Sequence, residues 1–269
     1  MVGKESLIKV INEVELSEHV YNPNAIENST LTLEETEKVL MEIELSRNVS
    51  DREILEAKNL AKVMSYVEEK ASMAELSLPF MLLLHKMLLW NMREEIAGRF
   101  RLLTEWVRVG NYIAEDPANI LSYLQKLLTK LRASPHEHIV SRIARFHLTF
   151  EHIHPFVDGN GRIGRVLNNY VLIREGYVPI NIAFINRADY YQAFKEFDKD
   201  ESIHTMELLV ARAITNSYHK RLAYLEGKEI IKLSEYAKRT KKSHASLLNK
   251  ANRQTIAAFR EKGIWKIGV

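Results

Sequence analysis

The stretch HPFVDGNGRIGR, residues 154–165, lies between two segments of helical character. Its two glycines, Gly159 and Gly161, flank Asn160 and let consecutive backbone N–H groups turn inward as a concave anion-binding nest. The helix expected to follow this loop adds the positive end of its dipole. The stretch therefore predicts a phosphate site made of a loop and the N-terminus of a helix.

Charged and titratable side chains accompany this predicted nest. Arg162 and Arg165 are three residues apart, so on the first turns of one helix they project to the same side and can clamp successive phosphates with planar guanidinium groups. Asp158 offers oxygen ligands suited to Mg²⁺, which also binds phosphate oxygens. His154 can take a proton near neutral pH. A glycine-rich turn or an arginine pair alone is usually structural, but their combination in one short stretch points to phosphate chemistry.

Length and composition favour a soluble, folded chain. The 269 residues suffice for one well-cored domain and a small module, and 46% hydrophobic and 27% charged residues are near globular averages. The chain has no cysteine, and its N-terminus, MVGKESLIKV, shows no secretion signal, so we expect a cytoplasmic protein. The most apolar window, Leu76 to Trp90, is too short for a bilayer span and predicts a buried helix, so we expect no membrane contact.

Charge divides the chain into two parts. Residues 229–269 carry ten Lys/Arg and three acids, a net charge of +7. The totals of 38 and 35 leave 28 basic and 32 acidic residues in 1–228, a net charge of −4. We therefore expect a main domain over 1–228 and a small C-terminal domain over 229–269, and only the second invites polyanions.

The pattern along the chain predicts a mainly α fold. Asn22-Pro23 and Asp116-Pro117 each place a cap residue before a proline, which favours helix starts there. Thr32 to Glu35 fits a capping box, followed by an apolar stripe that extends to Ile43 and Leu45. Only Phe100 to Val109, which precedes Gly110-Asn111, looks extended, and we interpret it as a hairpin.

Residues 154–165 resemble the signature of the Fic family, HxFx(D/E)GNGRxxR, and match it at every specified position. The resemblance covers about residues 20–225. It extends to the run-in from His147 to Ile153 and to Gly98-Arg99-Phe100-Arg101, which looks like the start of the family's β-hairpin flap. It implies a helical Fic-type bundle with that flap, and an enzyme that transfers AMP from ATP to a Ser, Thr or Tyr hydroxyl of a target protein.

The resemblance also implies roles for single residues. His154 becomes the general base and Asp158 the Mg²⁺ ligand. The residues expected to bind the nucleotide phosphates are Gly159, Asn160, Gly161, Arg162 and Arg165. Among them, Arg162 assists catalysis and Arg165 reaches the γ-phosphate. The expected catalytic residues are His154, Asn160 and Arg162. Related Fic proteins transfer other phosphate-containing groups or reverse the modification, so these activities stay as alternatives.

Two further segments look like parts of the family fold. Arg187 to Phe194, RADYYQAF, resembles the segment that closes over the nucleotide base. Tyr190, Tyr191 or Phe194 would offer apolar surface to the base, although core packing explains at least one of the tyrosines equally well. The flap over Phe100 to Val109 is expected to dock an extended segment of the target protein on its edge strand. The alternative is an ordinary surface hairpin.

Asn22 to Asn28 resembles the family's inhibitory helix, (S/T)xxxE(G/N), which we expect over about residues 22–30. Glu27 and Asn28 match, whereas Pro23 replaces the opening Ser or Thr and removes its hydroxyl. In the family this glutamate pairs with the second motif arginine, here Arg165, and displaces the γ-phosphate. Glu27 is therefore expected to hold the enzyme inactive; the alternative is an exposed helical carboxylate.

The basic tail resembles excisionase-like helix-turn-helix modules, which end in a run similar to Ala258 to Ile267. Helices are expected around Glu235–Arg239 and His244–Asn252, with a short strand after them. Candidates for contact with DNA bases or phosphates are His244, Ser246, Asn249, Lys250, Arg253, Lys241, Lys242, Lys262 and Lys266. The alternatives are a protein-binding or dimerising appendage, and the sequence leaves open whether the chain forms a homodimer. If DNA binding dominates, the chain is a transcriptional regulator whose Fic domain is an adjunct.

The remaining histidines do not suggest a metal site. His136 and His138, like His152 and His154, lack third and fourth ligands at a zinc-like spacing. His147 lies on an apolar helix and is expected to be a hydrogen-bonded core residue. Phe156 is expected to anchor the loop in the core.

Overall fold

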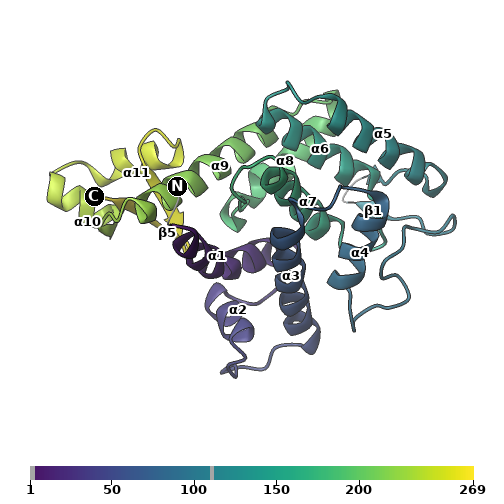
Figure 1. Ribbon diagram of the computed structural model, residues 1–269, viewed down its shortest axis with the longest axis horizontal. Helices are drawn as coiled ribbons and strands as arrows, with labels where there is room; N and C mark the ends of the chain where they lie inside the picture. Colours follow the sequence, from purple (N-terminus) through teal and green to yellow (C-terminus); the bar gives the residue numbers. More distant parts are fainter. Residues whose placement is uncertain (1–3, 110–111) are drawn as a thin grey trace.

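The computed structural model describes residues 4–109 and 112–269 and is mainly α-helical, as expected (Figure 1). The main body contains, in chain order, α1 Glu5–Ile26, α2 Leu33–Leu40, α3 Asp51–Lys70, α4 Leu78–Leu88, β1 Arg108–Val109, β2 Tyr112–Ile113, η1 Pro117–Asn119, α5 Ile120–Ala133, α6 Ile139–Ile153, α7 Asn160–Arg174, η2 Phe184–Asn186, α8 Arg187–Asp200 and α9 His204–Leu225. No helix within these described ranges is long and apolar enough to cross a membrane.

Helices α6 and α7 form the centre of the body and carry the loop 154–159 between them. Their facing side chains belong to one large apolar core, in which Phe150 and Phe156 are fully buried. Close approach of the two helices depends on Gly164, since a Cβ there would lie 2.5 Å from Glu151 Oε1 and 3.1 Å from the His147 ring. Phe156 is thus the predicted core anchor, and the core sets the position of the loop.

The predicted helix start at Asn22-Pro23 is wrong, because α1 begins at Glu5 and Pro23 lies in its last turns. Proline lacks the N–H that would bond to the carbonyl of residue 19, yet the preceding side chain supports the helix here: Asn22 Nδ2 donates to Glu18 O at 2.9 Å. Buried Val20 and Ile26 pack α1 into the body. Tertiary packing therefore outweighs the local proline signal.

The predicted caps on the other helices are present. Glu35 N donates to Thr32 Oγ1 at 3.1 Å and Thr32 N donates to Glu35 Oε2 at 2.8 Å, which completes the capping box of α2. Asp116 caps η1 through its side chain. However, α2 ends at Leu40, and Ile43 is 52% exposed, so the expected stripe does not continue past the helix.

The predicted hairpin is shorter than expected. Strands β1 and β2 pair antiparallel over two residues each, with Val109 opposite Tyr112, and the expected turn at Gly110-Asn111 lies outside the described residues. The segment from Phe100 onward is not a strand, because Arg99 forms two hydrogen bonds to the Glu105 carboxylate at 2.7 and 2.8 Å and bends the chain. The flap is therefore a turn followed by a short hairpin.

Residues 229–269 contain β3 Ile230–Lys232, α10 Leu233–Thr240, α11 His244–Asn252, β4 Ala258–Glu261 and β5 Ile264–Gly268. The two helices occur where they were expected, but three strands replace the single one, in the antiparallel order β3-β5-β4. A separate apolar cluster fills this C-terminal module, formed by Ile231, Leu233, Ala237, Leu247, Ala251, Ala258 and Ile267. The long helix α9 runs from the main body to the module (Figure 1).

Candidate active site

His154 ends α6 in a left-handed conformation, with φ 48° and ψ 61°, and its N–H donates to Phe150 O at 3.0 Å. Its Nδ1 lies 3.2 Å from Glu151 O. Because a carbonyl only accepts, Nδ1 carries the proton in this contact and Nε2 keeps a free lone pair. Burial lowers the pKa of His154 to about 4. The imidazole is therefore neutral at pH 7 and can act as a base through Nε2.

Arg101 holds the backbone of this histidine. The residue is 5% exposed, and its guanidinium donates to His154 O at 2.8 Å, to Glu105 O at 3.0 Å and to Glu115 O at 2.6 Å. One side chain thus ties the turn before the flap and the segment after it to the end of α6. The sequence had placed Arg101 only in the flap-like stretch, and no local pattern indicates a contact with a backbone 53 residues away.

His85 of α4 supports the loop from the other side. Its ring stacks on Phe156 at 3.8 Å between centroids. Gly98 N donates to His85 Nδ1 at 3.0 Å, so Nε2 carries the proton and donates to Asp158 O at 3.0 Å. Sequence reasoning missed this role, although a histidine inside the most apolar window of the chain must find hydrogen-bond partners.

The loop has the geometry of the predicted nest. Gly159 adopts φ +82°, and Asn160 closes the loop: its Oδ1 accepts from Phe156 N at 2.9 Å and its Nδ2 donates to Phe156 O at 2.9 Å. The first backbone bond of α7 runs from Ile163 N to Gly159 O, so the N–H groups of 160–162 have no acceptor within the helix. Asn160 can therefore reach a phosphate through its backbone, while its side chain shapes the loop.

Arg162 and Arg165 do not form a side-by-side clamp in this conformation. Arg162 turns to the loop and to α3, with NH2 3.2 Å from Asp158 Oδ1 and NH1 3.2 Å from Glu56 Oε1. Arg165 turns instead to α1. The difference arises because carboxylates from separate elements compete for the two guanidinium groups.

Asp158 is a single, partly exposed carboxylate among cations. Besides Arg162, its Oδ2 lies 3.4 Å from Arg52 and 3.8 Å from Arg93. Within residues 4–109 and 112–269, no group of three or more His, Asp and Glu could hold a metal ion by itself. Mg²⁺ commonly takes one or two carboxylates and fills its other positions with water and phosphate oxygens. Asp158 fits a Mg²⁺ ion that is bound together with a nucleotide.

Arg165 is held by the end of α1. Its NH2 lies 2.7 Å from Glu27 Oε1 and 3.1 Å from Pro23 O, and its NH1 donates to Tyr190 OH at 2.8 Å. Gly161 admits this contact, because a Cβ there would lie 2.1 Å from Glu27 Oε1. The predicted partner of Arg165 is therefore at hydrogen-bond distance, and it directly follows the last turn of a long helix rather than lying in a short helix over 22–30.

The end of α1 is also tied to the segment around α8. Arg187 donates to Asn28 Oδ1 at 2.6 Å, and Tyr191 OH donates to Ile26 O at 3.3 Å. Farther back, Phe184 N donates to Asn22 Oδ1 at 2.9 Å. The end of α1 next to Glu27 therefore contacts the same segment that was expected to close over a nucleotide base.

The two adjacent tyrosines have different environments. Tyr190 is 2% exposed and its hydroxyl lies between Arg165 and His147 Nε2, 2.8 Å from the histidine, so its ring is not available to a nucleotide base. That part of the prediction is corrected, because the helix phase turns this residue into the core. Tyr191 is 40% exposed, with Arg187 5.3 Å from its ring centroid. His147 is fully buried and hydrogen-bonded, as expected.

Glu151 is a buried acid that sequence reasoning missed. It lies in α6, and its Oε2 is 3.9 Å from His154 Nδ1. Burial raises the pKa of Glu151 to about 8. It is therefore mostly protonated at neutral pH and does not supply a full negative charge to Arg165 beside Glu27.

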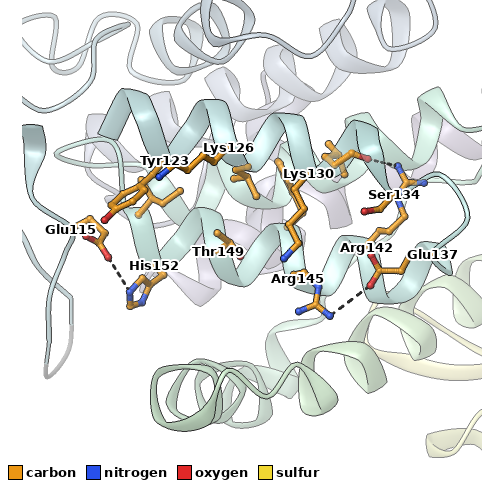
Figure 2. Close-up of a pocket in the computed structure, with 14 residues that line it drawn as sticks. Glu115, Tyr123, Lys126, Lys130, Ser134, Glu137, Arg142, Arg145, Thr149 and His152 are labelled. Atoms are coloured by element: carbon orange, nitrogen blue, oxygen red, sulfur yellow. Dashed lines mark hydrogen bonds and ion pairs between the residues drawn. The ribbon is translucent and has the colours of Figure 1, made fainter. Parts of the chain in front are cut away.

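A pocket apart from the loop 154–159 lies between α5 and α6, as Figure 2 shows. It has a volume of about 240 Å³, and Lys126, Lys130, Thr149 and His152 are among its lining residues. His152 contacts Glu115 Oε1 at 3.3 Å at one end. No residue of 154–165 lines this pocket, so it is not part of the nest.

The chain is similar to known proteins over the region that carries this site. Residues 75–172 match the model of the Fic/DOC family. The protein adenylyltransferase Fic of Drosophila virilis is 33% identical over 181 residues, which make up 66% of this chain and 37% of that protein. The chain thus spans little more than a third of the length of this relative.

Solved structures share the fold. A Fic family protein from Desulfovibrio desulfuricans G20 matches with a TM-score of 0.69 and 20% identity over 100% of this chain and 90% of that chain. The BepC effector of Bartonella tribocorum, solved with bound AMPPNP, matches with a TM-score of 0.50 and 17% identity over 64% of this chain and 91% of that chain. The arrangement of helices around the loop is therefore shared beyond the matched sequence.

Proposed function

We propose that this chain, in which residues 75–172 form a Fic/DOC domain, is a protein adenylyltransferase that modifies a Ser, Thr or Tyr hydroxyl of a target protein with AMP from ATP. One observation carries the proposal: a neutral histidine with a free Nε2 stands at the entry of a loop whose N–H groups lack acceptors within their helix. A base beside an anion site is what transfer of a nucleotide to a hydroxyl requires.

In this reaction the target hydroxyl gives its proton to His154 Nε2 as its oxygen attacks the α-phosphorus of ATP. A new P–O bond forms, the bond from the α-phosphorus to the bridging oxygen breaks, and pyrophosphate leaves in line with the attack. The chain contributes mainly position and charge. The N–H groups of 160–162 and the Arg162 guanidinium would neutralise the phosphates.

Asp158 is the residue that would hold Mg²⁺ together with phosphate oxygens. The ion supplies charge neutralisation for the phosphates when it is bound. Arg162, Arg52 and Arg93 now share the Asp158 carboxylate and would have to give up part of these contacts.

Two comparisons support ATP and AMP. The Drosophila virilis relative is named a protein adenylyltransferase, and BepC holds AMPPNP, an analogue of ATP. The transfer of other phosphate-containing groups, and the removal of AMP, remain the competing activities for the same residues.

The surface near the flap suits a target protein. Four large apolar side chains are exposed there, each by more than half: Leu102, Leu103, Trp106 and Ile113. Exposed apolar clusters of this kind mark protein contacts. We propose that the target packs against them and pairs with the short hairpin, which would place its hydroxyl near His154.

The proposed enzyme is autoinhibited. Glu27 occupies the guanidinium of Arg165, which would otherwise bind the γ-phosphate. Because one guanidinium cannot serve both partners in the same geometry, ATP binds productively only after Glu27 leaves.

Intact mass spectrometry tests the activity. The chain, its Glu27→Gly variant and its His154→Ala variant are incubated with ATP and Mg²⁺, with and without a cell lysate as a source of targets. We expect a gain of one AMP group on the Glu27→Gly chain or on lysate proteins, and none with His154→Ala. No AMP gain in any sample would overturn the proposal.

A second function, DNA binding by residues 229–269, is favoured by one observation. The side chains expected to read DNA, His244, Ser246, Asn249, Lys250 and Arg253, are all exposed on or next to α11. Two of the expected phosphate contacts are already engaged: Lys262 Nζ is 2.8 Å from Glu37, and Lys266 pairs with Glu261. We propose that residues 229–269 form a separate domain that binds DNA. The basic residues that are not engaged in these ion pairs would contact the phosphates.

Gel shifts with random and promoter DNA test the second function. A shift that weakens as salt rises is expected, since phosphate contacts release counterions. Absence of a shift at about 50 mM salt contradicts DNA binding and leaves a protein-binding or dimerising appendage.

A further inference from the structure

A large cleft lies between the main body and the C-terminal module, away from the nest. Its walls come from α1, from η2 and the segment before it, from α9, and from α11 and the β4–β5 hairpin. Its volume is about 840 Å³, within the range of small-molecule sites. No residue of 154–165 lines it. The cleft exists only because segments far apart in the chain meet there.

Two guanidinium groups in the cleft lack a carboxylate partner. Arg212 of α9 is exposed and Arg260 of β4 is half-buried. Both line the cleft, and neither forms an ion pair with a residue that the structure describes. Arg260 Nε donates to Gly263 O at 2.9 Å. Burial lowers the pKa of Arg260 more than the attraction of Glu18 raises it. A half-buried cation without a counterion favours the binding of an anion.

The acidic groups of the cleft are mostly neutralised. Lys220 is 3% exposed and lies 3.0 Å from Glu18 Oε2 and 3.5 Å from Glu15 Oε1, and the other Glu18 oxygen accepts from Lys262 N at 2.9 Å. Asp189, at the exposed start of α8, is the remaining carboxylate of the lining. The half-buried Arg260 therefore keeps unpaired positive charge in the cleft, and the exposed Arg212 adds to it.

Flat and apolar side chains accompany the two arginines. The Arg260 guanidinium lies 5.9 Å from the centroid of the Trp265 ring. Phe184 is 37% exposed, Ile185 is 64% exposed, and both line the cleft. Such surfaces favour the flat apolar part of a ligand, whereas the guanidinium groups favour its charge.

We propose that this cleft is a binding site for a small organic anion, whose acidic group lies on Arg212 and Arg260 and whose flat apolar part packs on Trp265. Inorganic anions alone would leave the apolar walls unused. The ligand is therefore an aromatic or other flat acid rather than free phosphate.

Occupation of the cleft has a consequence for the proposed enzyme, and this step rests on the proposed function. Tyr21 and Asn22 of α1 line the cleft, and Glu27 lies at the end of the same helix. A movement of the end of α1 that releases Glu27 would also displace Tyr21 and Asn22 from the cleft, so a ligand bound there favours the arrangement in which Glu27 contacts Arg165. The ligand therefore strengthens autoinhibition.

The aromatic sulfonate 8-anilinonaphthalene-1-sulfonate serves as the probe. Its fluorescence is titrated with the chain, with Arg260→Gln, with Trp265→Phe and with the matched control Arg253→Gln, an exposed cation outside the cleft. We expect binding about tenfold or more weaker for Arg260→Gln, weaker for Trp265→Phe, and unchanged for Arg253→Gln. Circular dichroism checks that each variant is folded. Equal affinities of the folded Arg260→Gln chain and the unaltered chain would overturn the site.

A second arm separates this proposal from the proposed function. Labelling by radiolabelled ATP is measured at saturating probe for the unaltered chain and for Glu27→Gly. The probe should decrease labelling of the former and leave the latter unchanged. An equal effect on both chains would contradict the link to α1. If Glu27→Gly does not label at all, the enzymatic proposal fails, while the fluorescence titration still decides the cleft.

Discussion

Substitution of Glu27 by glycine is the sharpest test of the proposed autoinhibition. The change removes the carboxylate that lies 2.7 Å from Arg165 NH2. A hydrogen bond between charged groups contributes about 1.5–3 kcal/mol. The Glu27 side chain is 38% exposed, so solvent screening reduces this contribution to about 1–2 kcal/mol. The fraction of molecules with a free Arg165 should then rise by about 5- to 30-fold.

Initial rates of labelling by radiolabelled ATP measure this increase. Glu27→Gln is the matched variant, because its amide oxygen still accepts from Arg165 but carries no charge. Its rate should fall between those of the unaltered chain and Glu27→Gly. His154→Ala, combined with Glu27→Gly, should be inactive and sets the background.

The reasoning fails if Glu27→Gly labels at the rate of the unaltered chain while His154→Ala abolishes labelling. In that case the contact with Arg165 would be a surface ion pair without a role in ATP placement. A rate for Glu27→Gln that exceeds that of Glu27→Gly would also contradict competition for the guanidinium group.

Three other outcomes follow from the site. Arg101→Lys, placed in the Glu27→Gly chain, should lower the labelling rate about tenfold or more with little change in KM for ATP. The reason is that lysine cannot bind the carbonyls of His154, Glu105 and Glu115 at the same time. An unchanged rate would exclude this positioning role. Gly164→Ala should lower the free energy of unfolding by about 1–3 kcal/mol, measured by urea denaturation, since its Cβ would meet Glu151 and His147. Burial lowers the pKa of His154 to about 4 from its usual 6.5, so the imidazole stays neutral as the pH falls to 5.5. The labelling rate at pH 5.5 should therefore stay close to the rate at pH 7.5. A tenfold decrease would indicate that the pKa of His154 lies near its usual value.

Much of the candidate site was predictable because it is local. Gly159 shapes the loop through its backbone conformation, and Asn160 does so through hydrogen bonds to Phe156, only four residues away in the sequence. The capping box at Thr32 was predictable for the same reason. By contrast, the local signal at Pro23 was wrong, since the packing of α1 stabilises a helix through the proline. Tyr190 and Tyr191 could not be distinguished, because only the rotation of α8 against the core decides which one is buried.

The contacts that support the site could not be read from the sequence. Arg101 reaches a carbonyl 53 residues away, and His85 reaches one 73 residues away. The raised pKa of Glu151 depends on burial by several helices at once. Such contacts depend on how helices pack, and no short pattern encodes packing.

The sequence by itself determined which groups the candidate site holds: a histidine, a glycine-shaped loop, a carboxylate and two arginines in one short stretch, followed by a helix. Consecutive residues suffice for this because turns, caps and helix ends are set by neighbouring dihedral angles and hydrogen bonds. Only the tertiary structure decided which partners these groups have. It pairs Arg165 with Glu27 across 138 residues, buries His154 until its pKa falls, and forms the cleft beside α1. Burial and long-range charge pairing arise only when the helices pack together, so only the tertiary structure reveals them.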